Sequence, residues 1–286
     1  MSDASVYIRD LETADIPEAM QLVLAEGWNQ TPKDWELFLN NPDNICKCAG
    51  IGGKLVGTTT SYNFSNKVAW ISMVLVNKAF RGRGISKRLL NSTLNELNNC
   101  KNIKLDATEA GRKVYQKLGF VDEYKISRMI NSSFDHSIVT GPQIPSEILN
   151  PDVATIIEFD RNVFGALRQE LIQSWITDFP EKCRILKRKN KIEGFVLGRV
   201  GNRFHQIGPV SARTLNDAKS LILVTLKNLI EKPVVVDILN DKPELMQWLT
   251  SVGFEKKREF TRMYLKRNPY PGKRTHTFVI GGPEFG

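Results

Sequence analysis

The sequence predicts an α/β protein with a mixed sheet (an α+β arrangement), formed by two tandem domains of related fold. Three observations support this prediction. Short apolar runs typical of strands alternate with segments whose leucines have helical spacing. The alternation lapses once, in a polar stretch with two prolines, and then resumes. The same order of motifs returns after this lapse. At 286 residues, the chain is long enough for two hydrophobic cores.

The first half begins with a strand at 6–9, followed by a helix that ends near Glu26. Asp15 is a suitable N-cap for this helix, because Pro17 then lies in the first turn. The other elements expected in this half are a helix at 34–40, a hairpin at 46–49 and 55–62, a strand at 68–76, a helix at 84–97, a strand at 103–107, a helix at 110–118 and an extended segment at 120–130.

The second half has a similar order. Its expected helices are 151–159, 168–176, 217–230 and 243–252, and its expected strands are 183–187, 194–200, 234–239 and 254–265. Polar residues with prolines fill the interval before it, which reads as a linker. We therefore divide the chain into a domain at 1–132, a linker at 133–150 and a second domain at 151–286.

Matching residues indicate that one half duplicates the other. Asp106 and Asp237 occupy equivalent places in two apolar strands, and a helix follows each strand. A Gly-Phe pair closes each helix, and an Arg-Met pair follows at the same spacing in both halves (Gly119-Phe120 with Arg128-Met129, and Gly253-Phe254 with Arg262-Met263). Two unrelated domains rarely share four such features in one order, so the pattern favours duplication.

Composition excludes several classes of protein. With 41% hydrophobic and 25% charged residues, the chain is neither disordered nor fibrous. Forty Lys and Arg against 31 Asp and Glu leave a net charge of +9, which suits a polyanionic ligand. The sequence has no dense basic stripe, zinc-finger spacing or aromatic RNA-binding motif. We therefore expect no nucleic-acid partner.

The N-terminal residues and the cysteines suggest a cytoplasmic protein. No basic segment precedes an apolar run there, and no apolar run approaches the roughly 20 residues of a membrane helix. We therefore expect no membrane contact. None of the three histidines stands near a second ligand, so no metal is expected. Cys46, Cys48, Cys100 and Cys183 are predicted to be reduced and structural.

The most informative segment is residues 74–90, VLVNKAFRGRGISKRLL. A buried strand ends at Val76, and a basic turn leads directly into a helix. Gly82 and Gly84 lack a Cβ, so backbone amides there can approach a ligand closely. Together with the helix N-terminus, these amides form an anion site suited to a pyrophosphate. A solvated basic turn that caps a helix is the alternative explanation. The turn matches neither the P-loop nor the dinucleotide-binding glycine motif.

Residues 81–86, RGRGIS, resemble the acetyl-CoA loop R/Q-x-x-G-x-G/A of the GNAT superfamily of N-acetyltransferases. Ser86 stands where the family has Gly or Ala, a mild departure. Residues 115–120, YQKLGF, resemble the family's Y-x-x-L-G-F element, and one strand separates the two motifs as in the family. The likeness covers about residues 5–130. The segments EGWN at 26–29 and GPEFG at 282–286 further resemble a bacterial subgroup that joins a catalytic GNAT domain to a second, GNAT-like one.

The resemblance implies a cosubstrate, acetyl-CoA, and the residues that hold it. The strand before the loop splays from its neighbour in this family and pairs with pantetheine, while the loop amides hold the pyrophosphate. The residues at these places are Val74, Leu75, Val76, Arg81, Gly82, Arg83, Gly84, Ile85 and Ser86. Tyr115 matches the tyrosine that protonates the departing thiolate, a suitable task for a phenol. A packing aromatic is the alternative role.

The acceptor implied is a primary amine of a small molecule or a peptide. The amine must be neutral to attack the thioester, so a base or a water chain must remove its proton. Glu26 is the first candidate because its segment borders the acceptor pocket in this fold, and Asp106 and Glu109 are further candidates. Trp28 and Asn29 are expected to line the acceptor site; Trp28 is equally suited to the core.

The second half departs from the family at the loop. Its matching segment offers residues 216–219, NDAK, in place of glycines, and Asp217 brings a negative charge near the phosphate position. We therefore expect a degenerate domain that binds no CoA and either walls the acceptor pocket or forms a homodimer surface. Relatives of this fold are commonly dimeric. A non-catalytic module that senses acyl-CoA through the same loop is the alternative to an enzyme.

Overall fold

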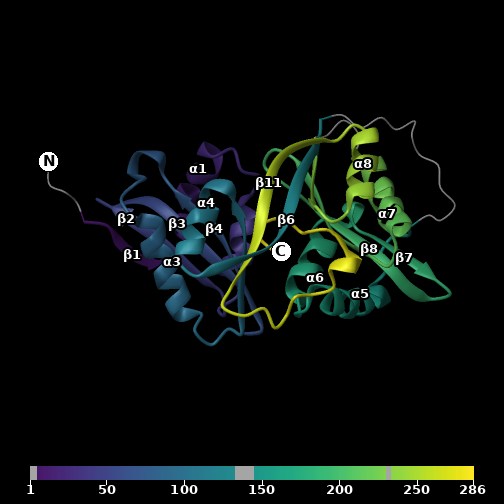
Figure 1. Cartoon of the computed structure of the whole chain (residues 1–286), viewed down its shortest axis with the longest axis horizontal. Coiled ribbons are helices and arrows are strands. Elements are labelled where there is room, and N and C mark those ends of the chain that lie inside the picture. Colours follow the sequence, from purple (N-terminus) through teal and green to yellow (C-terminus); the bar gives the residue numbers. More distant parts are fainter. Residues whose placement is uncertain (1–4, 133–144, 230–232) are drawn as a thin grey trace.

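The computed structural model describes residues 5–132, 145–229 and 233–286 (Figure 1). The linker predicted at 133–150 lies largely outside these residues. In the first half the structure has β1 (Tyr7–Asp10), α1 (Ile16–Ala25), α2 (Pro32–Leu39), β2 (Ile45–Ile51), β3 (Lys54–Phe64), β4 (Val68–Val76), α3 (Ile85–Glu96), β5 (Asn102–Thr108), α4 (Glu109–Lys117) and β6 (Phe120–Asn131). Every helix and strand predicted for this half is present.

The second half has α5 (Asn150–Phe164), α6 (Gln169–Asp178), β7 (Arg184–Arg188), β8 (Lys191–Val200), β9 (His205–Ala212), α7 (Leu215–Lys227), β10 (Val234–Leu239), α8 (Pro243–Ser251), β11 (Glu255–Leu265) and β12 (Thr277–Val279). β9 and β12 were not predicted. β9 contains Gly208 and Pro209, which are unusual inside a strand and hide its pattern. α5 is longer than expected and ends at Gly165, whose φ of +95° suits glycine.

The strands of both halves form one sheet, and the halves exchange their last long strands. The order among the described residues is β1-β2-β3-β4-β5-β11-β6-β10-β12-β9-β8-β7. β11 from the second half therefore pairs with β5 of the first, and β6 from the first half pairs with β10 of the second. β6 and β11 also pair with each other, and Figure 1 shows them running side by side at the centre. Each half thus completes the sheet of the other.

Two equivalent ion pairs hold this exchange. Arg262 of β11 donates two hydrogen bonds to Asp106 of β5, at 2.9 and 2.8 Å. Arg128 of β6 donates two, both at 2.8 Å, to Asp237 of β10. The four residues are those that matched between the halves in the sequence. The repeat motif therefore consists of an aspartate and an arginine that each find their partner in the opposite half.

Helices cover both faces of the sheet. The largest buried cluster joins α1 and α2 of the first half to α5 and α6 of the second, so one core runs across the junction. α3 and α4 cover the opposite face in the first half, and α7 and α8 do so in the second. The C-terminal residues enter the shared core: Phe285 is fully buried and stacks on Phe38 at 5.1 Å between ring centroids.

The sheet opens between β4 and β5. These parallel strands pair only from Val68 to Trp70 on β4, and no pairing joins them from Ile71 onward. On its other edge β4 stays paired with β3, with a register shift near Met73, whose φ is +50°. This bulge turns the end of β4 away from β5. The splay predicted by the family resemblance is therefore present.

Candidate active site

A cleft of about 710 Å³ fills the opening between β4 and β5. Six parts of the chain form its walls: the segment after α1, the end of β4, the turn at 81–84 with the start of α3, the end of β5, the side of α4, and β11 with the C-terminal segment. Of the residues predicted to bind the cosubstrate or the acceptor, those that line it are Glu26, Trp28, Val74, Leu75, Val76, Arg81, Gly82, Gly84, Ile85, Ser86 and Tyr115. Predictions from distant parts of the sequence thus converge on one cleft.

The turn before α3 presents open backbone to the cleft. Gly82 and Gly84 have φ values of +80° and +72°, a region that side chains disfavour, and a Cβ at either position would meet nothing within 4 Å. Gly84 is the N-cap of α3, and no side chain caps this end. The first amides of the helix are thus available to an anion. Arg83 lies outside the cleft lining, with its guanidinium 5.4 Å from the Phe80 ring centroid.

The edge of β4 offers a second set of backbone groups. From Ile71 to Val76 this edge has no strand partner among the described residues, because β5 has diverged. Val74, Leu75 and Val76 line the cleft beside it. An extended amide chain can pair with such an edge as a strand would.

Tyr115 lies on α4 and reaches the cleft half-buried. Its ring meets Phe120 edge-on at 5.9 Å, and a Cβ at Gly111 would come within 2.9 Å of it. Gly111 therefore leaves the space that the ring needs. Among the described residues the Tyr115 hydroxyl has no hydrogen-bond partner. Burial raises the pKa of Tyr115 above that of an ordinary phenol, so the hydroxyl stays protonated at neutral pH.

Three carboxylates suggested as bases have different surroundings. Glu26 follows α1 at the rim of the cleft, where it accepts a hydrogen bond from Arg81 at 2.5 Å, with Lys78 at 3.7 Å. The Asp106 carboxylate forms an ion pair with Arg262 and has no exposed side-chain surface. Glu109 is the first residue of α4 and is exposed to solvent in the cleft wall. Glu26 is thus the one of the three held directly by the predicted phosphate loop.

Trp28 and Asn29 have different places. Trp28 lines the cleft and is half-buried. Asn29 is 2% exposed and lies outside the lining. Its Oδ1 accepts hydrogen bonds from the backbone amides of Arg203 and Phe204, both at 2.9 Å. The structure therefore gives Asn29 the task of holding the β8–β9 turn against the first half.

The second half contributes wall residues that sequence reasoning missed. Arg258, Glu259 and Thr261 of β11, with Pro283, line the cleft. At its inner end the cleft adjoins a compartment of about 50 Å³, which we call the inner compartment. Its lining adds Gln30, Met73, Arg128, Phe260 and Glu284 to residues of the cleft wall. The repeat and the GPEFG segment were the available signals, but neither located these residues. Walling the cleft was one of two roles expected of this half.

The equivalent turn of the second half is closed to an anion. α7 begins after Thr214, whose Oγ1 accepts a hydrogen bond from the Asp217 amide at 3.2 Å. The Asp217 carboxylate is 2% exposed, accepts from Thr214 Oγ1 at 2.7 Å and pairs with Arg188. A capped helix end that already holds a carboxylate leaves no place for a phosphate.

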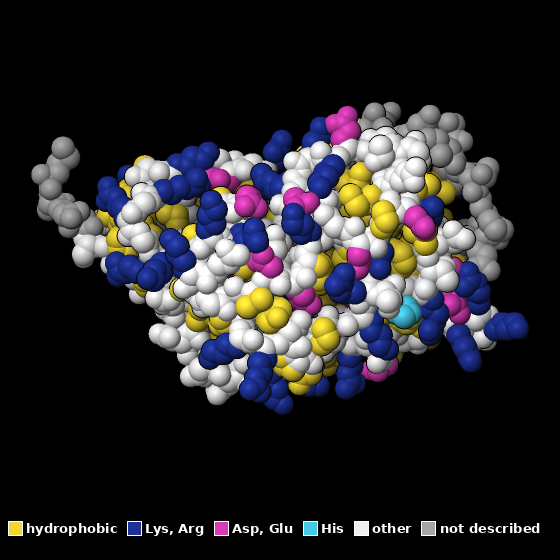
Figure 2. Space-filling model, in the orientation of Figure 1, with side chains coloured by type: hydrophobic (Ala, Val, Ile, Leu, Met, Phe, Trp, Pro, Cys, Tyr) yellow, Lys and Arg dark blue, Asp and Glu magenta, His cyan; other side chains and the backbone are white. Residues whose placement is uncertain are grey.

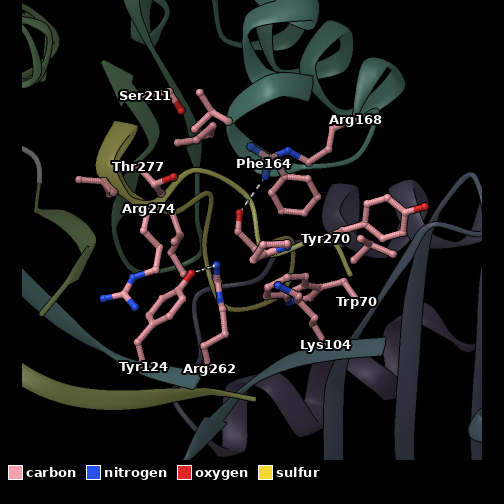
Figure 3. A pocket seen from close by; sticks show the side chains of 17 residues that line it. Trp70, Lys104, Tyr124, Phe164, Arg168, Ser211, Arg262, Tyr270, Arg274 and Thr277 are labelled. Atoms are coloured by element: carbon pink, nitrogen blue, oxygen red, sulfur yellow. Dashed lines mark hydrogen bonds between the residues drawn. The ribbon is translucent and has the colours of Figure 1, made fainter. Parts of the chain in front are cut away.

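A smaller hollow of about 30 Å³ lies at the junction between the halves (Figure 3). Basic side chains surround it, but each has a carboxylate partner: Arg168 pairs with Asp160 at 2.7 Å, and Arg262 with Asp106. Arg262 also donates to the Tyr124 hydroxyl at 2.6 Å, a contact drawn in Figure 3. The space suits about two water molecules. We therefore interpret it as a packing junction.

The surface and the described side chains add two observations. Figure 2 shows Lys and Arg side chains spread over one face with Asp and Glu between them. In the described ranges, no helix is long and apolar enough to span a membrane, and no group of three or more His, Cys, Asp or Glu could hold a metal ion.

Comparison with known families defines the class of this protein. Residues 9–120 match the model of the acetyltransferase (GNAT) family, and residues 156–279 match that of an acetyltransferase (GNAT) domain. The chain belongs to the GNAT superfamily of acyltransferases and carries one GNAT domain in each half. The resemblance inferred from the loop and the Y-x-x-L-G-F element, and the predicted fold, are therefore confirmed.

Particular relatives have low sequence identity but similar length. The holothin acyltransferase of Pseudoalteromonas sp. (strain SANK 73390) is 22% identical over 92% of this chain and 88% of its own. The uncharacterized N-acetyltransferase YitH of Bacillus subtilis (strain 168) is 23% identical over 85% of this chain and 82% of its own. A candidate acetyltransferase from Pyrococcus horikoshii has a crystal structure that covers 98% of this chain and 96% of its own, with a TM-score of 0.82 and 23% identity. This last likeness shows the fold.

Proposed function

We propose that this protein transfers an acetyl group from acetyl-CoA to a primary amine of a small molecule or a peptide. The observation that carries the proposal is the meeting of three features in one cleft: the uncapped start of α3, the unpaired edge of β4 and the hydroxyl of Tyr115. The names of two relatives, an acyltransferase and an N-acetyltransferase, agree with acyl transfer, and the second name specifies transfer to nitrogen.

The residues present fit acetyl-CoA, which supplies an activated acyl carbon and a thiolate leaving group. The amides of residues 82–86 and the Arg81 guanidinium hold the pyrophosphate, since nothing occupies the space above Gly82 and Gly84. The edge from Val74 to Val76 pairs with the amides of pantetheine. These contacts fix the thioester at the inner end of the cleft and so lower the entropic cost of attack.

Two proton transfers accompany the change of bonds. As the amine nitrogen forms a bond to the acyl carbon, the carbon–sulfur bond breaks and Tyr115 gives its proton to the sulfur. Glu26, at the rim of the cleft, takes a proton from the amine through water. Glu26 is held by Arg81, and a pyrophosphate competes for the same guanidinium. Cosubstrate binding therefore frees the carboxylate when a base is needed.

An acceptor screen tests this proposal. The protein is incubated with acetyl-CoA and a panel of primary amines, matched with their N-acetylated forms as controls. Free CoA thiol and the mass of the product are measured together. We expect thiol release and an acetylated product in equal amounts for at least one amine and for none of the blocked controls. Tight binding of acetyl-CoA with no transfer to any amine, including peptide N-termini, would instead identify a non-catalytic sensor.

A further inference from the structure

The inner compartment lies where the first half, β11 and the C-terminal segment meet. It adjoins the cleft beside Ser72 and Asp106, which line both spaces. A water-sized group needs roughly 10–15 Å³ by the same measure. The compartment of about 50 Å³ therefore has room for a group of aminomethyl size. Met73 and Phe260 give it apolar walls, and Glu284 brings a carboxylate.

A buried charge cluster adjoins this compartment. The guanidinium of Arg199 lies between Asp34, at 3.3 Å, and Glu284, whose Oε1 accepts a hydrogen bond from Arg199 Nη2. The side chains of Arg199, Asp34 and Glu284 are 1%, 3% and 2% exposed. One cation and two carboxylates leave a net charge of −1 in the interior. An uncompensated buried charge is costly, so the cluster favours a cation beside it.

The other charges at the compartment do not supply that cation. Arg128 is neutralised by Asp237 at 2.8 Å, and Asp106 is neutralised by Arg262. Arg258 is exposed at the rim, where solvent screens its charge. Asp34 also accepts hydrogen bonds from the backbone amide and the hydroxyl of Thr31 at the start of α2, at 2.7 and 3.0 Å, so the charge that lacks compensation is mainly that of Glu284. We attribute its compensation to a ligand.

Two buried acceptors at the same place also lack a donor. Glu284 Oε2 and Gln30 Oε1 have no hydrogen-bond partner in the described part of the chain, and the two residues are 2% and 5% exposed. Buried oxygens of this kind are costly to leave unpaired. A primary ammonium group carries three N–H donors and one positive charge. A bound ammonium group would therefore donate hydrogen bonds to both unpaired oxygens and compensate the negative net charge.

We propose that the inner compartment is the subsite for the amino group of the acceptor, and that Glu284 is its principal binding residue with Gln30 as the second. This inference rests on the proposed function, since the group bound there is the one to be acetylated; the ammonium first loses one proton to water, and the neutral amine then attacks. It makes the C-terminal segment of the second half a specificity determinant of the first half's reaction.

The test compares Glu284→Gln with Asp34→Asn. Both substitutions remove one negative charge from the cluster around Arg199, but only Glu284 lines the inner compartment. The probes are ethylammonium, benzylammonium and tryptammonium, each paired with a neutral alcohol of the same shape. Binding is measured by calorimetry with CoA present. We expect wild type to prefer an ammonium over its alcohol at least tenfold and Glu284→Gln to lose this preference. Asp34→Asn should reduce it less, because it removes the net charge of the cluster but keeps the carboxylate that lines the compartment.

Three results would overturn the subsite: no ammonium preference in wild type, an unchanged preference in Glu284→Gln, or the same loss in Asp34→Asn. Because Arg199 keeps Asp34 as its counter-ion, Glu284→Gln should leave the unfolding midpoint close to that of wild type. If the variant nevertheless does not fold, Gln30→Met tests the same compartment, with an expected loss of at least threefold; no loss there counts against the subsite.

Acetyl-CoA titration of the same proteins separates this inference from the proposed function. Wild type and Glu284→Gln should bind acetyl-CoA equally, because the loop at 81–86 is untouched. Ammonium preference without acetyl-CoA binding would refute the proposed function and leave the subsite standing. If the protein binds acetyl-CoA and acetylates an amine, but Glu284→Gln leaves the ammonium preference unchanged, the proposed function stands and the subsite is refuted.

Discussion

Replacing Arg262 with Met is expected to destabilise the protein by about 4 kcal/mol, because it leaves Asp106 buried without its partner. Breaking a buried ion pair on one side typically costs about 3–5 kcal/mol. The Asp106 carboxylate has 0% exposed side chain and accepts two hydrogen bonds from Arg262, which also donates to Tyr124 at 2.6 Å. Replacing Arg128 with Met should destabilise the protein less, because Asp237 would still accept a hydrogen bond from Gln206 Nε2 at 3.1 Å.

The cost should also depend on pH. Burial raises the pKa of Asp106, and the Arg262 guanidinium opposes that rise. Without Arg262 this opposition is lost, so the folded-state pKa rises further above the unfolded value and the folded form holds its proton to higher pH. The variant should therefore lose stability as pH rises from about 4 towards 7, and its difference from wild type should shrink at acid pH.

Urea unfolding followed by tryptophan fluorescence and circular dichroism measures both effects. The double variant Asp106→Asn with Arg262→Met should recover about 2 kcal/mol relative to the sum of the single changes. Arg83→Met, an exposed change in the loop, should stay within about 0.5 kcal/mol of wild type. If Arg262→Met lowers the free energy of unfolding by less than about 1 kcal/mol at every pH, the claim that this buried ion pair stabilises the exchanged strands is refuted.

Three further predictions concern the cleft and the core. Tyr115→Phe should lower kcat by on the order of 10²-fold and leave acetyl-CoA binding unchanged; wild type should show no loss of rate below pH 10 from this residue, because burial raises its pKa. Glu26→Gln should lower kcat while acetyl-CoA binds at least as tightly, since Arg81 loses a competing carboxylate; weaker binding would count against the proposed release. Phe285→Ala should cost about 3–5 kcal/mol in urea unfolding, because the ring is fully buried between Phe38 and Trp175.

The local features of the site could be predicted from the sequence. The turn at 81–84 needs two residues with left-handed backbone conformation, and the sequence has glycine at both positions, Gly82 and Gly84. The turn is therefore predictable from local sequence. The strand before it and the helix after it follow from hydrophobic spacing. Tyr115 followed from its place in a second motif, again without knowledge of distant contacts.

The features that depend on distant partners could not be predicted. Asp106 and Arg262 are matched by Asp237 and Arg128, so the motif is equally consistent with pairing inside each half or across the halves. The exchanged pairing follows from the tertiary placement of β6 and β11. Asn29 was assigned to the acceptor site because nothing local shows that its partners are the Arg203 and Phe204 amides.

The exchange also explains why the cleft needs both halves. β11 supplies Arg258, Glu259 and Thr261 to a wall beside the first half's loop. A single GNAT domain cut after residue 132 would lack this wall and would leave Asp106 buried without Arg262. We therefore expect the two domains to be inseparable for folding and for activity.

The central claim is that acetyl-CoA binds at the uncapped start of α3, and calorimetric titration of Gly84→Asp against Gly84→Asn tests it most directly. A side chain at Gly84 would meet nothing within 4 Å, and its φ of +72° is tolerated by Asp and Asn alike. The two variants therefore share strain and shape and differ in one negative charge. We predict that Gly84→Asn keeps acetyl-CoA affinity within about fivefold of wild type and that Gly84→Asp loses at least tenfold more. Equal affinity in the two variants, or no binding in wild type, would contradict the account.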